Sequence, residues 1–175
     1  FYVSGQLLTE DYYVANKLMK GFIGSANIDT NSRLCMASSV AGHRRAFGSD
    51  TVPGLYADLD QADCVVLVGS NLAWCHPVLF QRLAAAREKR GTRIVVIDPR
   101  RTATCEIADL HLPIAAGADA ALFNRLLAEI DRRGLIAPDP ALDGLDQALL
   151  AANRTDAAVT GLATADLARF VNLWC

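Results

Sequence analysis

The chain has 175 residues, of which 52% are hydrophobic and 21% are charged, and its formal net charge is −2. This composition is typical of a globular protein with a sizeable core. A slightly acidic chain with scattered basic residues argues against a nucleic-acid surface. No apolar run approaches the roughly 18 residues of a membrane span, and no signal-peptide pattern opens the chain, so we expect no membrane partner. The chain lacks an initiator Met, and its last residues stop inside an apolar helical pattern, so we expect a piece of a longer polypeptide.

The cysteine usage favours a reducing compartment. The chain has five cysteines, Cys35, Cys64, Cys75, Cys105 and Cys175, and no two of them form a C-x-x-C pair. An odd number without such pairs is a poor fit to a zinc site, an iron–sulfur cluster or a disulfide framework. We therefore expect a protein whose thiols stay reduced.

The first 48 residues are predicted to form a short strand and two helices. The strand covers residues 1–4, and Thr9 is a suitable N-cap for a helix that runs to about residue 22. A polar loop follows over residues 24–32. The second helix covers about residues 35–47, because a glycine directly after it is a common helix end.

Two continuous apolar runs, residues 64–68 and 93–97, predict buried strands. Between them, residues 76–90 read as a helix that Gly91 closes. Strands without polar alternation are typical of a parallel sheet whose two faces are both covered by helices. We therefore expect both strands to be buried on both faces.

The remaining segments continue this alternation of strands and helices. Residues 57–62 are predicted to form a short helix, and residues 109–114 alternate polar and apolar as an edge strand does. Residues 119–133 form an amphipathic helix for which Asp119 is a good N-cap. We predict an α/β fold with a doubly wound, mainly parallel sheet and helices on both faces. Residues 1–135 should form this domain, with 136–175 as a truncated helical continuation.

The turns after the two buried strands are the first candidates for a binding site, because parallel sheets bind ligands at the carboxyl ends of their strands. Gly69 lets a ligand approach the backbone, and Ser70 and Asn71 place polar groups just before a helix. The same three residues also make an ordinary connection between a strand and a helix, and the residues alone leave both interpretations open.

Asp98 follows the second strand, where a carboxylate accepts hydrogen bonds from a ribose hydroxyl or from the N1–H and 2-amino groups of guanine. Arg100 and Arg101 are then placed to meet phosphate. The alternative is an Asp that caps the next helix beside two solvated arginines. The run Gly117–Asp119 is a third candidate of this kind, with a carboxylate in a turn before a helix. Here the alternative is an Asp that only caps the helix.

Cys35 is a candidate nucleophile or metal ligand. It opens a predicted helix and lies two residues after Arg33, and both features stabilise a thiolate. A thiolate attacks electrophiles and ligates soft or redox-active metals. The alternative is a structural cysteine without chemistry.

Taken together, several motifs resemble the molybdopterin oxidoreductase family, and within it the catalytic subunit of assimilatory-type bacterial nitrate reductases. The motifs, in chain order, are Asn-Ser-Arg-Leu-Cys-Met-Ala-Ser-Ser-Val at 31–40, Val-Gly-Ser-Asn at 68–71, His-Pro at 76–77, Ile-Asp-Pro-Arg-Arg-Thr at 97–102, Ala-Asp at 108–109 and Gly-Ala-Asp at 117–119. The resemblance covers about residues 1–135, and its specificity comes from the order and spacing of the motifs.

By position, the resemblance implies that Cys35 ligates the molybdenum of a molybdenum bis(molybdopterin guanine dinucleotide) cofactor. Met36, beside it, is the second catalytic position and favours the nitrate reductase branch. Gln6 and Asn31 match positions that contact the cofactor. The other implied cofactor-binding residues are Val68, Gly69, Ser70, Asn71, Cys75, His76, Ile97, Asp98, Pro99, Arg100, Arg101, Gly117, Ala118 and Asp119.

The implied function is the reduction of nitrate to nitrite in cytoplasmic nitrate assimilation, with the periplasm as the alternative location. The implied partners are nitrate, the remaining domains of the same polypeptide, and an electron donor that is an NADH-linked flavoprotein subunit, ferredoxin or flavodoxin. A [4Fe-4S] cluster belongs to the part of such enzymes outside this chain. We therefore expect the isolated chain to be inactive and empty of molybdenum.

Three alternatives remain. The chain is a piece of a formate dehydrogenase-like enzyme or of another oxo-transferase, or a non-catalytic molybdopterin-fold subunit of a respiratory complex, or a generic nucleotide-binding domain. The absence of a G-x-G-x-x-G motif counts against an ordinary nicotinamide enzyme.

Overall fold

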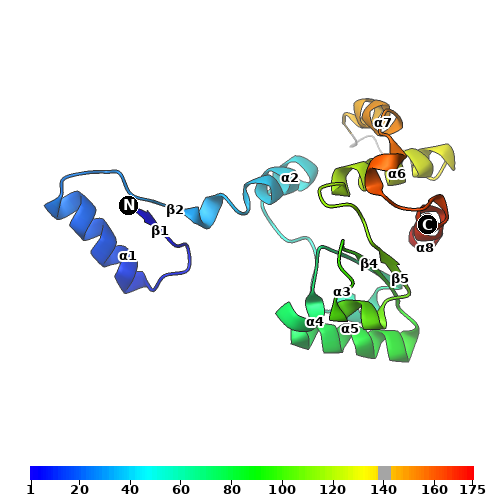
Figure 1. The fold of residues 1–175 in the computed structure, drawn as a ribbon, viewed down its shortest axis with the longest axis horizontal. Coiled ribbons are helices and arrows are strands. Elements are labelled where there is room, and N and C mark those ends of the chain that lie inside the picture. The colour runs from blue at the N-terminus through cyan, green and yellow to red at the C-terminus, as the bar shows by residue number, and fades with distance from the viewer. Residues whose placement is uncertain (138–142) are drawn as a thin grey trace. The chain divides into compact units, whose positions relative to one another are not determined.

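The computed structural model describes residues 1–137 and 143–175, and the chain divides into two compact units, Phe1–Gly54 and Leu55–Cys175 (Figure 1). Within the described part of the chain, no helix has the length and apolar character needed to cross a bilayer. The domain boundary near residue 135 stays a prediction.

The smaller unit contains a two-stranded parallel sheet. Its elements are β1 (Tyr2–Val3), α1 (Thr9–Asn16), the π-helical segment η1 (Lys17–Phe22), β2 (Asp29–Thr30), the 3-10 helix η2 (Asn31–Arg33) and α2 (Ala37–Phe47). The predicted strand and the ends of both helices near residues 22 and 47 are confirmed.

Three details of the prediction for this unit are wrong. Leu8 rather than Thr9 is the N-cap of α1, and Thr9 is its first helical residue. The predicted loop over residues 24–32 contains β2, which is only two residues long and depends on pairing with β1 rather than on its own pattern. Cys35 lies in a turn two residues before α2, because that helix begins at Ala37.

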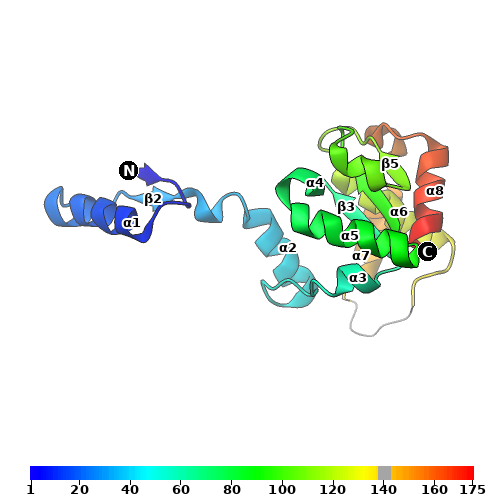
Figure 2. The same ribbon diagram turned by 90° about the horizontal axis from the view of Figure 1, so that it is seen from below.

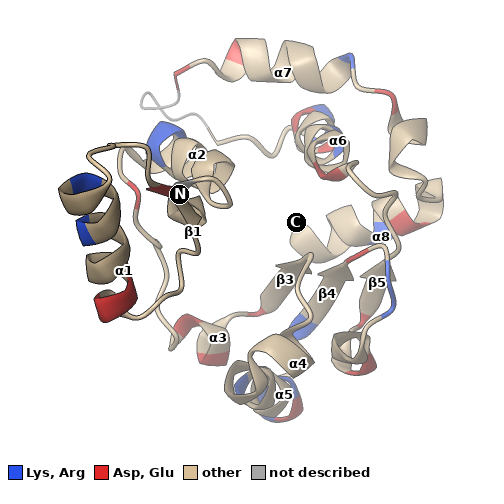
Figure 3. Ribbon diagram, turned by 60° about the vertical axis from the view of Figure 1, so that its left-hand side comes forward, with Lys and Arg blue, Asp and Glu red and all other residues tan. Residues whose placement is uncertain are grey.

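The larger unit is built on three parallel strands in the order β3-β4-β5. Its elements are α3 (Asp58–Gln61), β3 (Cys64–Val68), α4 (Leu72–Cys75), α5 (Pro77–Arg90), β4 (Arg93–Ile97), η3 (Ala103–Ile107), β5 (Leu110–Leu112), α6 (Asp119–Arg132), α7 (Leu145–Asn153), η4 (Ala157–Thr160) and α8 (Thr164–Trp174). Figure 2 shows α5 lying along the sheet, and Figure 3 shows the three strands side by side. The predicted parallel sheet with helices on both faces is confirmed.

The two cores of this unit follow from the alternation of side chains along β4. Val95 and Ile97 point to one face and pack in a cluster with side chains of α6 and α8, including the fully buried Phe170. Ile94 and Val96 point to the other face and pack with Leu83 of α5. Thus β4 is buried on both faces, as predicted.

The same expectation is wrong for β3, whose first four residues are partly buried and whose last residue, Val68, is exposed. In the described sheet β3 is an edge strand, with β4 on one side only. The apolar pattern of residues 64–68 does not distinguish a central strand from an edge strand.

The register of the sheet brings the candidate loops to one edge. Val68 pairs with Ile97, and Ile97 pairs with Leu112, so the three strands end at the same level. The chain leaves the sheet there at Gly69 and at Asp98, and the third loop, after β5, leads to Gly117. This is the carboxyl edge, the edge at which we predict the binding site.

Candidate functional site

The first loop of the carboxyl edge is shaped by Gly69. Its φ of +57° lies in the left-handed region that favours glycine, and its N–H donates to the carbonyl of Ile97 at 2.8 Å. A Cβ at this position would find no atom within 4 Å. The backbone of Gly69 is therefore fixed by β4 while one side of it stays open.

The Asn71 side chain is held by a hydrogen bond from a buried threonine that the sequence analysis did not identify. The hydroxyl of Thr104, which is fully buried, donates to Asn71 Oδ1 at 3.2 Å and accepts from the Ala73 N–H at 3.1 Å. Its position in η3 gave no signal, because a threonine in a short polar connection is common. Part of the hydrogen-bonding capacity of Asn71 is thus used by the fold.

The residues after Asn71 form the single turn α4, which the sequence pattern did not predict. Cys75 and His76 at its end are exposed, and α5 begins at Pro77, one residue later than expected. Exposed side chains at the start of a long helix are available to a ligand or to another part of the protein.

Asp98 is the central residue of the second loop. It is only 5% exposed, its Oδ1 accepts the Arg100 N–H at 2.8 Å, and the Arg100 side chain lies 4.0 Å from the same oxygen. In the described part of the chain, no group donates a hydrogen bond to Oδ2. Asp98 therefore stabilises its own loop and keeps one oxygen for another donor, while Arg100 and Arg101 are exposed.

Thr102, at the end of this loop, has a buried Oγ1 without a hydrogen-bond partner among the described residues. Buried polar atoms are nearly always paired in native proteins, so an orphan beside an exposed loop indicates a missing partner. The sequence shows that Thr102 directly follows Asp98-Pro-Arg-Arg101, but it does not show that the hydroxyl is buried without a partner.

The third loop repeats the glycine geometry of the first. Gly117 has a φ of +81° and no atom within 4 Å of a Cβ position. Ala118, 3% exposed, is the N-cap of α6, so Asp119 is its first helical residue and not the cap that we expected. The carboxylate of Asp119 is exposed and not used by the helix as a cap.

In the smaller unit, the thiol of Cys35 is free and exposed in the turn before α2. The predicted charge beside it, the Arg33 side chain, lies outside the described residues. Met36 is 54% exposed and lines a groove of about 500 Å³ together with Val40 and Arg44. These three side chains follow at intervals of four residues and so share one face of the helical segment.

Gln6 and Asn31 lie at the same end of the two-stranded sheet. The Asn31 Oδ1 accepts the N–H of Gly5, and a Cβ on Gly5 would lie 2.5 Å from Ser32 Oγ. Asn31 thus has a structural contact of its own, and the Gln6 side chain is exposed. Among the residues described, no three His, Cys, Asp or Glu side chains could hold a metal ion, so protein atoms alone form no metal cage.

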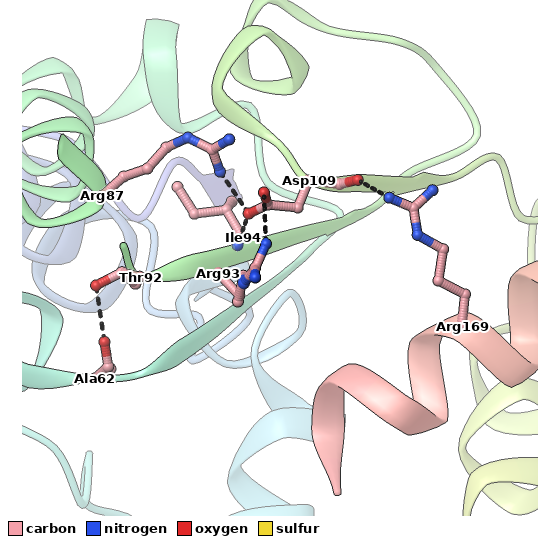
Figure 4. A network of polar contacts seen from close by, with 7 residues as sticks. All are labelled: Ala62, Arg87, Thr92, Arg93, Ile94, Asp109 and Arg169. Carbon is pink, nitrogen blue, oxygen red and sulfur yellow. Dashed lines mark hydrogen bonds and ion pairs between the residues drawn. The ribbon is translucent and has the colours of Figure 1, made fainter. Parts of the chain in front are cut away.

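A different polar cluster occupies the opposite, amino edge of the sheet (Figure 4). Asp109 lies just before β5, and its Oδ2 accepts hydrogen bonds from the Arg87 guanidinium and, at 2.8 Å, from the Ile94 N–H. The Arg93 guanidinium lies 3.7 Å from Oδ1. Burial alone would raise the pKa of Asp109, but the two hydrogen bonds and both arginine charges hold that pKa below its ordinary value. Asp109 is a structural carboxylate.

Comparison with known proteins identifies the family. A sequence profile described as "Molybdopterin oxidoreductase" matches residues 1–143. The chain is 66% identical over 140 residues to a nitrate reductase of Klebsiella oxytoca, covering 79% of this chain and 16% of that protein. It is 54% identical over 168 residues to a nitrate reductase of Shewanella frigidimarina, covering 93% of this chain and 18% of that protein. Formate dehydrogenase subunits match at lower identity.

The fold agrees with a solved structure, that of acetylene hydratase from Pelobacter acetylenicus. The TM-score is 0.70 at 29% identity, and the match covers 85% of this chain and 21% of that one. The chain therefore spans less than a quarter of the length of these relatives. The profile match includes Cys35 and all three loops of the carboxyl edge, and on this basis the chain belongs to the molybdopterin oxidoreductase family.

Proposed function

We propose that this chain is the cofactor-binding part of a molybdenum nitrate reductase. In this proposal the carboxyl edge of the sheet holds the guanosine and phosphate end of a molybdopterin guanine dinucleotide, and Cys35 gives a thiolate to the metal. The observation that carries it is the 66% identity to a nitrate reductase over 140 residues.

The residues of the carboxyl edge fit such a group. Asp98 offers the unused acceptor Oδ2, which matches the N1–H and 2-amino donors of guanine. The orphan hydroxyl of Thr102 and the exposed Arg100 lie in the same loop, where a polar and anionic ligand would satisfy both. The open backbone at Gly69 and Gly117 leaves space for a ligand to approach closely.

Cys35 fits the role of the protein ligand. Its thiol is exposed and forms no disulfide, and a thiolate is a ligand that soft and redox-active metals prefer. The remaining sulfur ligands would be the dithiolene sulfurs of the cofactor. Met36, next in sequence and exposed on the neighbouring groove, would face the substrate side.

When bound, the cofactor supplies the two-electron chemistry that converts nitrate, two electrons and two protons into nitrite and water. The residues of this chain bind and orient it. We propose further that the enzyme serves nitrate assimilation in the cytoplasm, with the periplasm as the alternative. Its electrons would come from an NADH-linked flavoprotein, ferredoxin or flavodoxin through a [4Fe-4S] cluster outside this chain.

The test is the Cys35→Ser variant of the full-length enzyme, with Cys175→Ser as the matched control because that thiol is also exposed and free. Nitrate turnover and molybdenum content should fall by more than about tenfold in Cys35→Ser, since even the outer partners of metal ligands are worth about 10–100-fold. The control should keep both. Near-normal nitrate turnover by Cys35→Ser, or turnover of formate in place of nitrate by the unaltered enzyme, would overturn the proposal.

The isolated chain provides a second test. It should show no nitrate turnover and no bound molybdenum after purification, because it spans only 16–18% of the nitrate reductases that it matches. Stoichiometric molybdenum in the purified chain would contradict this.

A further inference from the structure

We infer that His111 is a positioning residue for Asp98, and this inference rests on the proposed function for its consequence in ligand binding. His111 is the middle residue of β5, and it is not among the residues that the sequence assigned to the site. Its Nε2 lies 2.9 Å from the backbone carbonyl oxygen of Asp98, across the gap between β5 and the loop after β4.

The direction of this contact is fixed by chemistry. A carbonyl oxygen only accepts, so Nε2 of His111 carries the proton and donates it. The neighbours of His111 explain why it faces the loop: Leu110 and Leu112 both point into the cluster with α6 and α8, so His111 points to the other face of the sheet. Its partner in the register is Val96, two residues before Asp98 on that same face.

With His111 in place, three of the four polar groups of Asp98 are held by the fold. The N–H donates to the Leu112 carbonyl at 3.2 Å, the C=O accepts from His111, and Oδ1 accepts from the Arg100 N–H at 2.8 Å. Pro99 limits the conformation further, because the residue before a proline is restricted to extended backbone. Among the described residues, these restraints leave Oδ2 as the acceptor of Asp98 without a donor, and they fix its position.

The consequence is that His111 fixes the carboxylate before the ligand arrives. A carboxylate that must be ordered on binding costs affinity, whereas one already held in place does not. Loss of the histidine donor should therefore loosen the Asp98–Arg100 turn and weaken binding of a guanine nucleotide, although His111 itself does not touch the ligand.

Two variants separate the hydrogen bond from simple packing. His111→Phe keeps an aromatic ring and removes the donor, whereas His111→Gln places an amide N–H near the position of Nε2 and removes the ring. Two quantities on the 175-residue chain test them: amide hydrogen exchange at Arg100, whose N–H donates to Asp98 Oδ1, and the affinity for GDP and ADP by calorimetry. The Val95 amide in the middle of β4 is the internal control for global stability.

In His111→Phe, amide exchange at Arg100 should become about tenfold faster and GDP affinity should fall by about tenfold, which corresponds to the loss of one hydrogen bond. Amide exchange at Val95 should not change. In His111→Gln both should stay within about twofold of the unaltered chain. Unchanged Arg100 exchange in His111→Phe, or equal losses in both variants, would overturn the inference. If exchange responds as expected while no form of the chain prefers GDP, the positioning role stands and the proposed function fails.

Discussion

The two edges of the larger sheet each carry a mostly buried aspartate, and the two are used in opposite ways. At the amino edge, Asp109 receives the guanidinium of Arg87 and the Ile94 N–H, with a second arginine nearby (Figure 4). At the carboxyl edge, Asp98 receives one backbone N–H and keeps an oxygen free among the described residues. Both carboxylates are largely buried, and they differ in the number of groups that donate hydrogen bonds to them.

The amino edge is also tied to distant parts of the unit. Arg169 of α8 donates to the Asp109 carbonyl at 2.8 Å, and the Thr92 hydroxyl donates to the Ala62 carbonyl at 2.9 Å. At the carboxyl edge, Gly69 and Gly117 leave open backbone, and the side chains of Arg100 and Arg101 are exposed. The amino edge is thus held by hydrogen bonds to α8 and to the segment before β3, whereas the loops of the carboxyl edge present polar groups to solvent.

The largest expected effect comes from Asp109→Ala. It leaves the Ile94 N–H and the Arg87 guanidinium without their acceptor, so the free energy of unfolding should fall by about 3 kcal/mol. Urea denaturation measures this. The matched control is Asp63→Ala, whose fully exposed side chain forms an ion pair with Arg90 at 3.5 Å and should have little effect on the free energy of unfolding. Equal effects of the two changes would show that the partners of Asp109 add no stability beyond that of an exposed carboxylate.

The contribution of Asp109 should depend on pH in a defined direction. Because its pKa is lower in the folded chain, its stabilisation is present above the ordinary aspartate pKa and is lost as pH falls through the lowered value. The difference in stability between the unaltered chain and Asp109→Ala should therefore narrow in acid. Denaturation curves at neutral and acidic pH test this, and a difference that widens in acid would contradict it.

At the carboxyl edge, Gly69→Ala should lower the free energy of unfolding by about 1 kcal/mol, because alanine is strained at a φ of +57° even where space is open. Gly42→Ala is the control, since Gly42 lies inside α2 without a positive φ and alanine favours helices there by about 0.5–1 kcal/mol. Opposite signs for the two changes in urea denaturation are expected. A stabilising Gly69→Ala would mean that the loop does not need its left-handed turn.

The smallest change in stability, with a clear change in binding, is expected for Asp98→Asn. The amide retains an oxygen that accepts the Arg100 N–H, so the free energy of unfolding should change by less than about 0.5 kcal/mol. GDP affinity should nevertheless fall by about tenfold or more, because a neutral amide is a weaker acceptor for the guanine donors. Unaltered GDP affinity would show that Asp98 is not the guanine-binding carboxylate.

The parts of the fold that the sequence predicted well are those decided by local pattern. The ends of β3 and β4, and the closure of α5 by Gly91, follow from apolar runs and a helix-ending glycine, and the structure confirms them. The parts that failed depend on tertiary context. β2 exists through its pairing with β1, and the caps of α1 and α6 lie one residue earlier than expected, so that Thr9 and Asp119 are the first helical residues.

The candidate site divides in the same way. Asp98, Gly69 and Gly117 were identified from their places after strands, and the structure brings the loops that carry them to one edge. Thr102, Thr104 and His111 were missed, because an orphan hydroxyl, a buried anchor and a cross-strand donor are visible only once neighbouring segments are in place. The assignment of ligands to these residues stays a prediction.

Calorimetric titration of the 175-residue chain with GDP, and in parallel with ADP, tests most directly whether the carboxyl edge is a guanine site. Adenine lacks both the N1–H and the 2-amino group that Asp98 Oδ2 would accept. The account predicts that GDP binds at least about tenfold more tightly than ADP, because a site built to hydrogen-bond two donors rejects a base that lacks them. Equal affinities, or tighter binding of ADP, would contradict it.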